Sequence, residues 1–404
     1  MERKPLLSVL IATKNRQKYC LNVVESILSL KFDDIEVVVQ DNSDEQNLET
    51  MLVNCLKDGR LKYRYTPPPF SSIANFNAAI ELSTGEYVCL IGDDDGINPE
   101  IMDAVKWASE NNIDSIAGNI GANYRWEGTN VPNTRFTKMS GATLSVADFT
   151  GNAKFIDIEK SLDALMQNGC TNYLEFELPK LYHGAIKRSV LENIKNETGE
   201  YIKGLSPDIY AAISLASRVN KSVYIDYPLT IPGVCGQSTS VTEGQLKKHS
   251  KKLEDAPHFR DRGEYFWAEE VPKIYCVQTI WADSGFAALR EMKRNDLIAK
   301  FNKYALYANI LVADHTLQPQ IDERIVVDKA MGSFSSAKWK TAKTAKKAGH
   351  LFKRIRNRAV IMLQKNSLVV YEGVKNIFAA MLKLEEHLKS KNILLSEKLK
   401  TIKF

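Results

Sequence analysis

Three short apolar runs in the first hundred residues constrain the fold of this chain more than any other feature. They cover Leu6–Thr13 (LLSVLIAT), Ile35–Gln40 (IEVVVQ) and Tyr87–Ile91 (YVCLI). A short run that is nearly continuous in apolar residues is typical of a β-strand buried on both faces. Each run is followed by a polar segment, so we expect each strand to end at a turn.

Helical patterns separate these runs. Apolar side chains recur at helical spacing over 16–30 and 73–82, and a further helix is predicted over 45–56. A short strand is predicted over 61–65, just before the prolines at 67–69. Strands that alternate with helices predict a mostly parallel, Rossmann-like α/β sheet with helices on both faces. In such a sheet, ligands bind outside the carboxyl ends of the strands.

The strand and helix patterns are weaker in the middle of the chain. A strand is predicted over 182–187, a helix over 207–217 and a last strand of the sheet over 223–227. Residues 120–175 are polar and irregular, and 245–330 are mostly helical in pattern. The sequence therefore predicts that the sheet is completed well before the end of the chain.

The length of 404 residues exceeds one ordinary compact domain. We expect a large catalytic domain over 1–245, a helical region over 246–330 packed on it, and a basic amphipathic helical tail over 331–404. The six cysteines are scattered without a CxxC pair, which argues against a disulfide framework and favours a reducing compartment. No stretch has the features of a cleaved signal peptide, or the roughly 18–20 apolar residues of a membrane span.

The tail concentrates the positive charge of the chain. Residues 331–404 hold 17 Lys and Arg against 4 Asp and Glu, so the remainder is acidic although the whole chain carries +5. Basic residues beside Trp339, Phe352 and Ile355 would suit an anionic inner-leaflet membrane surface. A heptad-like apolar seam over 370–402 would instead suit a homo-oligomer or a docking helix. The sequence leaves both interpretations open. Nucleic acid is not expected as a partner, because few aromatic stacking residues accompany the charge.

Asp93, Asp94 and Asp95 directly follow the third apolar run. Adjacent carboxylates repel each other and raise one another's pKa values. A divalent cation such as Mg²⁺ or Mn²⁺ removes this conflict, because it prefers oxygen ligands and commonly bridges carboxylates to a substrate diphosphate. A solvated acidic turn or a helix start is the alternative. The position at a strand end favours the metal and diphosphate site.

Asp41 and Asp208 are further candidates, each with a structural alternative. Asp41 ends the second run, where a carboxylate can accept a hydrogen bond from a nucleobase or ribose, although Asp also forms turns there. Asp208 stands at a predicted helix start, where it could deprotonate an acceptor hydroxyl or simply favour the helix dipole. On spacing alone the structural role is favoured for both. His183 is too isolated in the sequence to assign.

Taken together, these motifs resemble the family 2 glycosyltransferases, which have the GT-A fold. The similar segments are SVLIATKNR at 8–16, VQDNS at 39–43, NAAI at 77–80, GEYV at 85–88 and LIGDDD at 90–95. The resemblance covers roughly residues 5–110 well and extends weakly to about 240.

The resemblance implies an inverting, metal-assisted transfer of a sugar from a nucleotide-diphosphate donor, UDP by default, to a hydroxyl of a glycan or lipid-linked glycan. It assigns the catalytic base to Asp208 and the Mn²⁺ or Mg²⁺ ligands to Asp94 and Asp95. It assigns donor binding to Thr13, Asn15, Arg16, Asp41, Asn77 and Asp93. The segment 233–240 (GVCGQSTS) would lie near the diphosphate or the acceptor.

Two residues depart from the family's pattern. Gln40 stands where the first acid of the second-strand pair is usual, and Gly92 stands where the leading Asp of the metal motif is usual. The QxxRW motif of processive polysaccharide synthases is absent from the sequence. We therefore expect the addition of one or a few sugars.

Other classes of protein remain as alternatives. A non-catalytic glycan- or nucleotide-binding scaffold on the same fold is the main one, because a fold alone does not establish activity. The retained acids argue against it. An oxidoreductase or a P-loop enzyme is disfavoured, because no GxGxxG follows a strand and no Walker lysine loop is present. The sequence thus predicts a bacterial-type transferase for a surface polysaccharide, cytoplasmic or peripheral on the inner face of the membrane.

Overall fold

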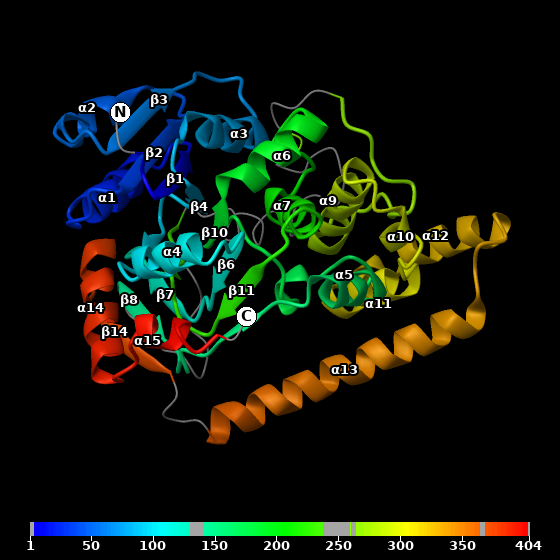
Figure 1. Ribbon diagram of the computed structural model, residues 1–404. Helices are drawn as coiled ribbons and strands as arrows, with labels where there is room; N and C mark the ends of the chain where they lie inside the picture. Colours follow the sequence, from blue (N-terminus) through cyan, green and yellow to red (C-terminus); the bar gives the residue numbers. More distant parts are fainter. Residues whose placement is uncertain (1–3, 130–140, 237–258, 260–263, 364–367, 403–404) are drawn as a thin grey trace.

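The computed structural model describes residues 4–129, 141–236, 259, 264–363 and 368–402, and for 354–363 the backbone alone (Figure 1). The strands are β1 (Leu7–Thr13), β2 (Ile35–Asp41), β3 (Leu61–Tyr65), β4 (Tyr87–Ile91), β5 (Gly96–Ile97), β6 (Ser115–Gly118), β7 (Ala122–Arg125), β8 (Thr143–Val146), β9 (Ala153–Phe155), β10 (Gly184–Lys187), β11 (Ser222–Ile225), β12 (Thr230–Ile231), β13 (Gly233–Val234) and β14 (Val369–Glu372).

Helices alternate with these strands and dominate the last third of the chain. They are α1 (Gln17–Leu28), α2 (Asn47–Met51), α3 (Ser72–Leu82), α4 (Ile101–Glu110), α5 (Ile158–Gln167), α6 (Arg188–Thr198), α7 (Pro207–Ala216), α9 (Val277–Glu291), α10 (Asn295–Ile298), α11 (Lys303–Ala313), α12 (Gln318–Ala330), α13 (Ser336–Leu363), α14 (Ile377–Ser390) and α15 (Leu395–Leu399). In the part of the chain that the structure describes, no helix is long and apolar enough to cross a bilayer.

An eight-stranded sheet forms the centre of the molecule, in the order β3-β2-β1-β4-β10-β6-β11-β9. β1 runs parallel to β2 and β4, β2 runs parallel to β3, and β11 runs parallel to β6. β10 is antiparallel to both of its neighbours, and β9 is antiparallel to β11. The predicted mostly parallel α/β sheet with a C-terminal helical part is confirmed, and the antiparallel insertion of β10 is a feature that the sequence did not predict.

The central strands are buried because both faces of the sheet are covered. β2 and β4 are buried at every residue, and β1 at all but one. Val9 belongs to a core that includes residues of α1, α4, α14 and α15, whereas its neighbour Leu10 belongs to a core with α3, α6, α7 and α9. Successive strand residues point to opposite faces, so a continuous apolar run supplies both cores.

The segment 120–175 is more regular than its polar sequence predicted. β7 pairs with β8 in a small four-stranded sheet that also contains β13 and β14, and α5 packs in the second core. This sheet lies beside the main one (Figure 1). It brings segments that are distant in the sequence, including β13, to the neighbourhood of the strand ends.

The predicted helical seam over 370–402 is wrong in its first part. Val370 lies in β14, which pairs antiparallel with β8, and the helix α14 begins only at Ile377. The seam residues Met381, Leu384 and Leu388 are at most 2% exposed, because α14 packs against α1, β5 and β7 of the same chain. The seam therefore docks inside this molecule and does not present an oligomer interface. The division of the chain at 245 and 330 stays a prediction.

Candidate functional site

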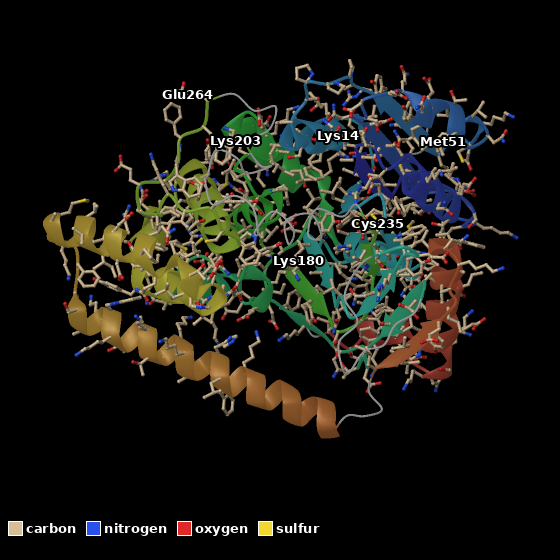
Figure 2. The ribbon with its side chains drawn as sticks, turned by 180° about the vertical axis from the view of Figure 1, so that it is seen from behind. Lys14, Met51, Lys180, Lys203, Cys235 and Glu264 are labelled. Atoms are coloured by element: carbon tan, nitrogen blue, oxygen red, sulfur yellow. The ribbon has the colours of Figure 1, made fainter. Side chains whose placement is uncertain are left out.

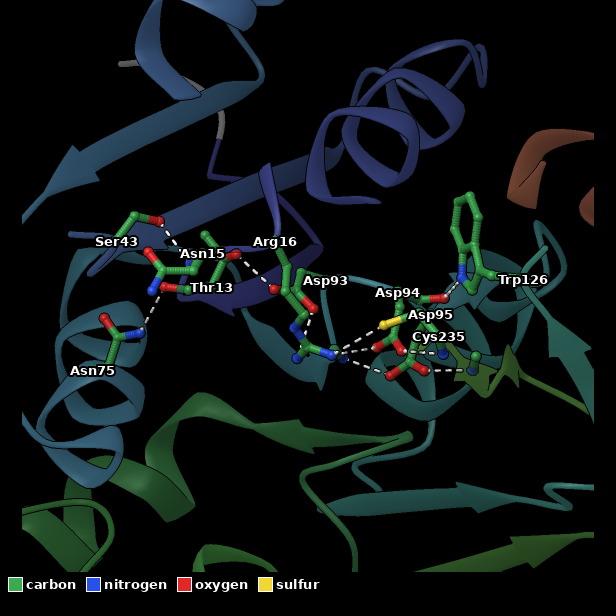
Figure 3. Close-up of polar contacts among 12 residues, drawn as sticks. Thr13, Asn15, Arg16, Ser43, Asn75, Asp93, Asp94, Asp95, Trp126 and Cys235 are labelled. Carbon is green, nitrogen blue, oxygen red and sulfur yellow. Dashed lines mark hydrogen bonds and ion pairs between the residues drawn. The ribbon is translucent and has the colours of Figure 1, made fainter. Parts of the chain in front are cut away.

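Polar side chains gather where β1, β2 and β4 end at one edge of the sheet (Figure 3). Thr13 is the last residue of β1, Asp41 is the last of β2, and the turn from Gly92 to Asp95 follows β4. β1 runs parallel to both of the other strands, so their carboxyl ends meet. The predicted convergence of these segments at a ligand-binding edge follows from this topology.

The Asp93 carboxylate is fully buried between two side chains from the β1 end. The Thr13 hydroxyl donates a hydrogen bond of 2.5 Å to Asp93 Oδ2. The Arg16 guanidinium forms an ion pair of 2.7 Å with Asp93 Oδ1, and another nitrogen of the same group is 3.4 Å from Asp94 Oδ1. The Arg16 guanidinium thus lies against two of the three acids.

Backbone and side-chain donors surround Asp94 and Asp95. The Cys235 amide donates to Asp94 Oδ2 at 3.1 Å, and the Trp126 indole donates to the Asp94 carbonyl at 2.7 Å. Asp95 Oδ1 accepts a hydrogen bond of 2.6 Å from the Gly233 amide. Asp95 Oδ2 accepts from the Gly92 amide at 2.5 Å and from the Tyr182 hydroxyl at 2.8 Å. The acidic turn is therefore held by donors from four separate segments.

Burial shifts the protonation of this cluster. It raises the pKa of Asp93 to about 7; Arg16 opposes the rise and Asp94 adds to it. Burial also raises the pKa of Asp95, although the field of His183 opposes the shift. For Arg16, burial lowers the pKa, but the nearby Asp93 and Asp94 outweigh it and the net shift is upward. The guanidinium stays charged, whereas Asp93 is partly protonated near neutral pH.

These residues do not fit a preformed divalent-cation site. Among the described residues, no group of three or more His, Cys, Asp or Glu side chains is arranged to hold a metal ion. Both oxygens of Asp95 already accept hydrogen bonds, and Arg16 lies against Asp94 Oδ1, where a cation would have to approach. A divalent cation needs several oxygen ligands at once. The assignment of Asp94 and Asp95 as metal ligands stays a prediction, and this arrangement does not favour it.

Asp41 and Asn15 organise the two turns beside the cluster. Asp41 Oδ1 accepts hydrogen bonds from the Ser43 amide and hydroxyl, at 2.9 and 2.6 Å, and Oδ2 accepts from the Tyr63 hydroxyl at 3.0 Å. Asn15 has a φ of 59°; its side-chain amide donates to Asp44 Oδ2, and its Oδ1 accepts from the Asp44 backbone amide. Asp41 thus forms the turn that was weighed against nucleotide binding, and its contact with a nucleotide stays a prediction.

Asn77 lies away from the strand ends and braces the segment before α7. Its side chain donates to the Ile202 carbonyl at 2.8 Å and accepts from the amides of Tyr201 and Ile202. Asn75, two residues earlier, donates to the Thr13 carbonyl at 3.2 Å, and its buried Oδ1 has no hydrogen-bond partner. The structure therefore brings Asn75 to the site, whereas the donor-binding role predicted for Asn77 has no geometric support.

Asp208 stands in the first turn of α7, after Pro207. Burial raises its pKa to about 6; a hydrogen bond from the Tyr173 hydroxyl opposes this rise, and the charge of Asp95 adds to it. The pKa of Tyr182 is raised well above its usual value by burial and by Asp95, Asp94 and Asp208 in turn. Asp208 therefore lies close enough to the acidic turn for their charges to influence each other.

Tyr182 and His183 are residues that the sequence did not reveal. His183 has a φ of 64°, its Nδ1 lies 2.9 Å from the Thr230 hydroxyl, and its Nε2 lies 3.5 Å from Asp95. Burial lowers its pKa, which favours the neutral imidazole. Residues other than Gly rarely have a positive φ, and those that do are often found at functional sites. Nothing in the local sequence marks this pair, because only the fold brings it to Asp95.

Gly92 explains the departure from the usual acidic motif. A Cβ atom at this position would lie 2.8 Å from the Tyr182 hydroxyl and 2.9 Å from Asp95 Oδ2. No side chain fits there without moving these groups. The missing leading Asp is thus the consequence of Tyr182 packing against the turn.

The loop predicted to lie near the diphosphate, 233–240, does reach the cluster in its first part. Gly233 and Cys235 donate their amides to Asp95 and Asp94, and the Arg16 guanidinium lies 3.7 Å from the Cys235 sulfur. Residues 237–240 lie outside the described part of the chain.

The acidic turn lies at the carboxyl edge of a mostly parallel α/β sheet, which is the edge where proteins of this architecture bind ligands. Residues 8–166 match the family model described as glycosyl transferase family 2. The match confirms, for residues 8–166, the resemblance to the family 2 glycosyltransferases.

Two bacterial relatives are similar to about a quarter of the chain. A protein of Escherichia coli (strain K12), whose name assigns it to the glycosyl transferases of colanic acid biosynthesis, is 32% identical over 100 residues, which are 24% of this chain and 36% of the relative. The GalNAc(5)-diNAcBac-PP-undecaprenol beta-1,3-glucosyltransferase of Campylobacter jejuni is 32% identical over 96 residues, 22% of this chain and 30% of the relative. The chain thus spans about a third of the length of these relatives.

Among solved structures, S. aureus TarS 1–349 in complex with UDP-GlcNAc is 15% identical, with a TM-score of 0.46, over 85% of this chain and 92% of that one. A mannosyltransferase from Pyrobaculum calidifontis in complex with GDP-Man and Mn²⁺ is 13% identical, with a TM-score of 0.39, over 87% of each chain.

Proposed function

We propose that this protein transfers a sugar from a nucleotide-diphosphate donor to a hydroxyl of a glycan acceptor, with inversion at the anomeric carbon. The observation that carries this proposal is the pair of separate acidic groups, the turn 93–95 and Asp208, that act on the same Tyr182 hydroxyl. One group stands at the strand ends, where nucleotides bind in such folds. The other stands across from it, where an acceptor would approach.

Asp208 suits the role of general base. A carboxylate whose pKa is near 6 is largely deprotonated at neutral pH and still has a useful affinity for a proton. In the proposed reaction, Asp208 takes the proton of the acceptor hydroxyl. The acceptor oxygen forms a bond to the anomeric carbon while the bond from that carbon to the diphosphate oxygen breaks, and the nucleoside diphosphate leaves with the electron pair.

Arg16 suits the role of a partner for the diphosphate. It occupies the position just before α1, where the helix dipole adds to its charge, and about a fifth of its side chain is exposed. A guanidinium can bind two phosphate oxygens at once. A bound diphosphate would compete with Asp93 and Asp94 for this cation.

The acceptor and the setting are the more specific parts of the proposal. The two relatives are named for colanic acid biosynthesis and for a glucosyltransferase acting on an undecaprenol-linked glycan, which supports a surface-polysaccharide acceptor carried on a lipid. The cysteines are all free thiols, which supports a reducing compartment such as the cytoplasm. UDP is the nucleotide to test first.

A panel of nucleoside diphosphates tests the proposal by thermal unfolding of the full chain. UDP, GDP, CDP and ADP are each added with and without Mn²⁺. We expect one of them to raise the Tm, since a ligand at a hundred times its Kd adds about 2.7 kcal/mol to the stability. A panel without any shift would contradict the proposal. If EDTA leaves the Tm shift unchanged, nucleotide binding does not need a metal ion.

A matched pair of variants in α1 and its start locates the binding. Arg16→Gln should weaken the nucleotide about tenfold or more, because a hydrogen bond to a charged group contributes about 1.5–3 kcal/mol. Lys18→Gln removes an exposed charge two residues away and should leave the affinity unchanged. If the nucleotide binds but no sugar reaches any acceptor, the non-catalytic scaffold becomes the better description.

A further inference from the structure

The middle of α13, over residues 347–353, is exposed on all sides. In the first half, Trp339 packs near Tyr307 of α11, with the two ring centroids 6.4 Å apart, and Lys346 donates to the Asn168 side chain. From 347 to 353 every residue is exposed, which is about two turns of helix. Figures 1 and 2 show α13 as a long rod along the outside of the molecule. Packing against the rest of the molecule therefore does not explain the apolar residues in this part of the helix.

The exposed part combines cations with large apolar side chains. α13 contains nine Lys and Arg and no Asp or Glu in 28 residues. Leu351 is 57% exposed and Phe352 is 67% exposed, and Lys347 and Lys353 flank them. The single ion pair described at this end joins Lys353 to Glu175, and exposed pairs of this kind contribute little. Large apolar side chains side by side on a surface usually mark a site of interaction.

The helix continues in the same pattern beyond the described side chains. Its backbone is helical to Leu363. In the sequence, Ile355, Ala359 and Met362 follow Leu351 at intervals of four, four and three residues. In the sequence this spacing is typical of an apolar stripe on an α-helix, and three of the eight intervening positions are Arg.

We infer that the exposed segment 347–353 of α13 binds the surface of an anionic lipid bilayer. Phe352 and Leu351 would enter the boundary between headgroups and acyl chains, while lysines such as Lys347 would reach the lipid phosphates. The helix would lie in the plane of the interface and would not cross it. This inference concerns a surface separate from the donor site and does not depend on the proposed transfer reaction.

Charge and chemistry argue against a second copy of the chain or a nucleic acid as the partner of this surface. A second copy of the chain would bring the same dense positive charge to the interface, and like charges repel. A nucleic acid would satisfy the lysines through its phosphates, but a phosphate backbone offers nothing to Leu351 and Phe352. An anionic bilayer accepts both kinds of side chain at once.

Sedimentation with vesicles tests the inference on the full-length protein. Vesicles of phosphatidylcholine alone are compared with vesicles that also contain phosphatidylglycerol, at low and at physiological salt. We expect binding to the anionic vesicles, weakening as salt rises. Phe352→Ser should weaken binding about tenfold or more, and Lys347→Gln about fivefold. Phe352→Trp should retain it, because Trp is favoured at the membrane interface.

Matched controls keep the result specific to α13. Val326→Ser changes an exposed apolar residue of α12, and Lys106→Gln removes an exposed charge of α4; neither should alter vesicle binding. Unchanged thermal unfolding of each variant would show that the fold is intact. Equal binding to neutral and anionic vesicles, or equal losses in the controls, would overturn the inference. So would tight binding to duplex DNA, insensitive to Phe352→Ser, without any binding to vesicles.

Discussion

At the scale of single residues, the site depends on the hydrogen-bond and ion-pair partners of each carboxylate. Asp93 pairs with Arg16 and Thr13, whereas Asp208 accepts a hydrogen bond from Tyr173 and is influenced by the charge of Asp95. Burial raises the pKa of both carboxyls, to about 7 and about 6 respectively. Groups with pKa values this close to neutrality are suited to moving protons at physiological pH.

Asp208→Asn tests the general base. The change should leave nucleotide binding intact and lower kcat about a hundredfold to ten-thousandfold, the range usual for loss of a general base. In the wild type, the base is inactive when protonated, so kcat/KM should fall as the pH drops through about 6. A pH profile of kcat/KM measures this limb, which should be absent from the residual activity of the variant.

Tyr173→Phe provides a second readout of the same group. The Tyr173 hydroxyl stabilises the ionised form of Asp208, so its loss should raise the pKa and move the acidic limb to higher pH. A variant with lower activity but an unmoved limb would show that Tyr173 acts only in packing. A limb that stays in place in Asp208→Asn would assign it to another group.

At the scale of elements, two short strands complete the acidic turn that follows β4. β12 pairs with β5 just beyond the turn, and β13 pairs with β7 of the small sheet. β13 passes so close to the turn that a Cβ atom at Gly233 would lie 1.8 Å from the Asp94 carbonyl oxygen. The Gly233 amide can reach Asp95 only because this residue has no side chain.

Gly233→Ala should therefore damage the turn directly. We expect the β13 backbone to move away from Asp94, at a cost of about 1–3 kcal/mol in the free energy of unfolding. Nucleotide stabilisation should fall as well, since Asp95 loses an amide donor. Gly59→Ala is the matched control, because no atom lies within 4 Å of the added Cβ. Urea unfolding of both variants measures the effect, and equal stabilities would show that the close approach is relaxed without cost.

At the scale of the whole molecule, the end of the chain returns to its beginning. α14 and α15 belong to the same core as β1, α1 and α4, although more than 250 residues of sequence lie between these groups. The Tyr124 hydroxyl also donates to the Val374 carbonyl, 250 residues away, at 2.8 Å. The C-terminal segment is thus part of the structure that supports the strand ends.

Leu384→Ala tests this dependence. Leu384 is 1% exposed, so its truncation should lower the free energy of unfolding by about 2–5 kcal/mol. Leu382→Ala, in the same helix, removes a side chain that is 46% exposed and should cost much less. Chemical unfolding of both variants gives the comparison. Similar, small losses would mean that α14 is only loosely attached to the central sheet.

Much of the fold and part of the site were determined by the sequence alone. The buried strands and the polar turns after them are local patterns, because burial on both faces demands continuous apolar residues whatever the rest of the chain does. Parallel pairing then places Thr13, Asp41 and Asp93 at one edge. The family, the sheet and the acidic turn at its carboxyl edge could be predicted for this reason.

Only the tertiary structure decided which partners these residues have. Arg16 against Asp93, Tyr182 against Asp95 and α14 against β5 are contacts between segments 77, 87 and about 280 residues apart. The periodicity of a short segment carries no information about such contacts, because they arise from how whole elements pack. The same reason explains why Asn75 and not Asn77 reaches Thr13. It also explains why the apolar seam of α14 is buried against other elements of the same chain.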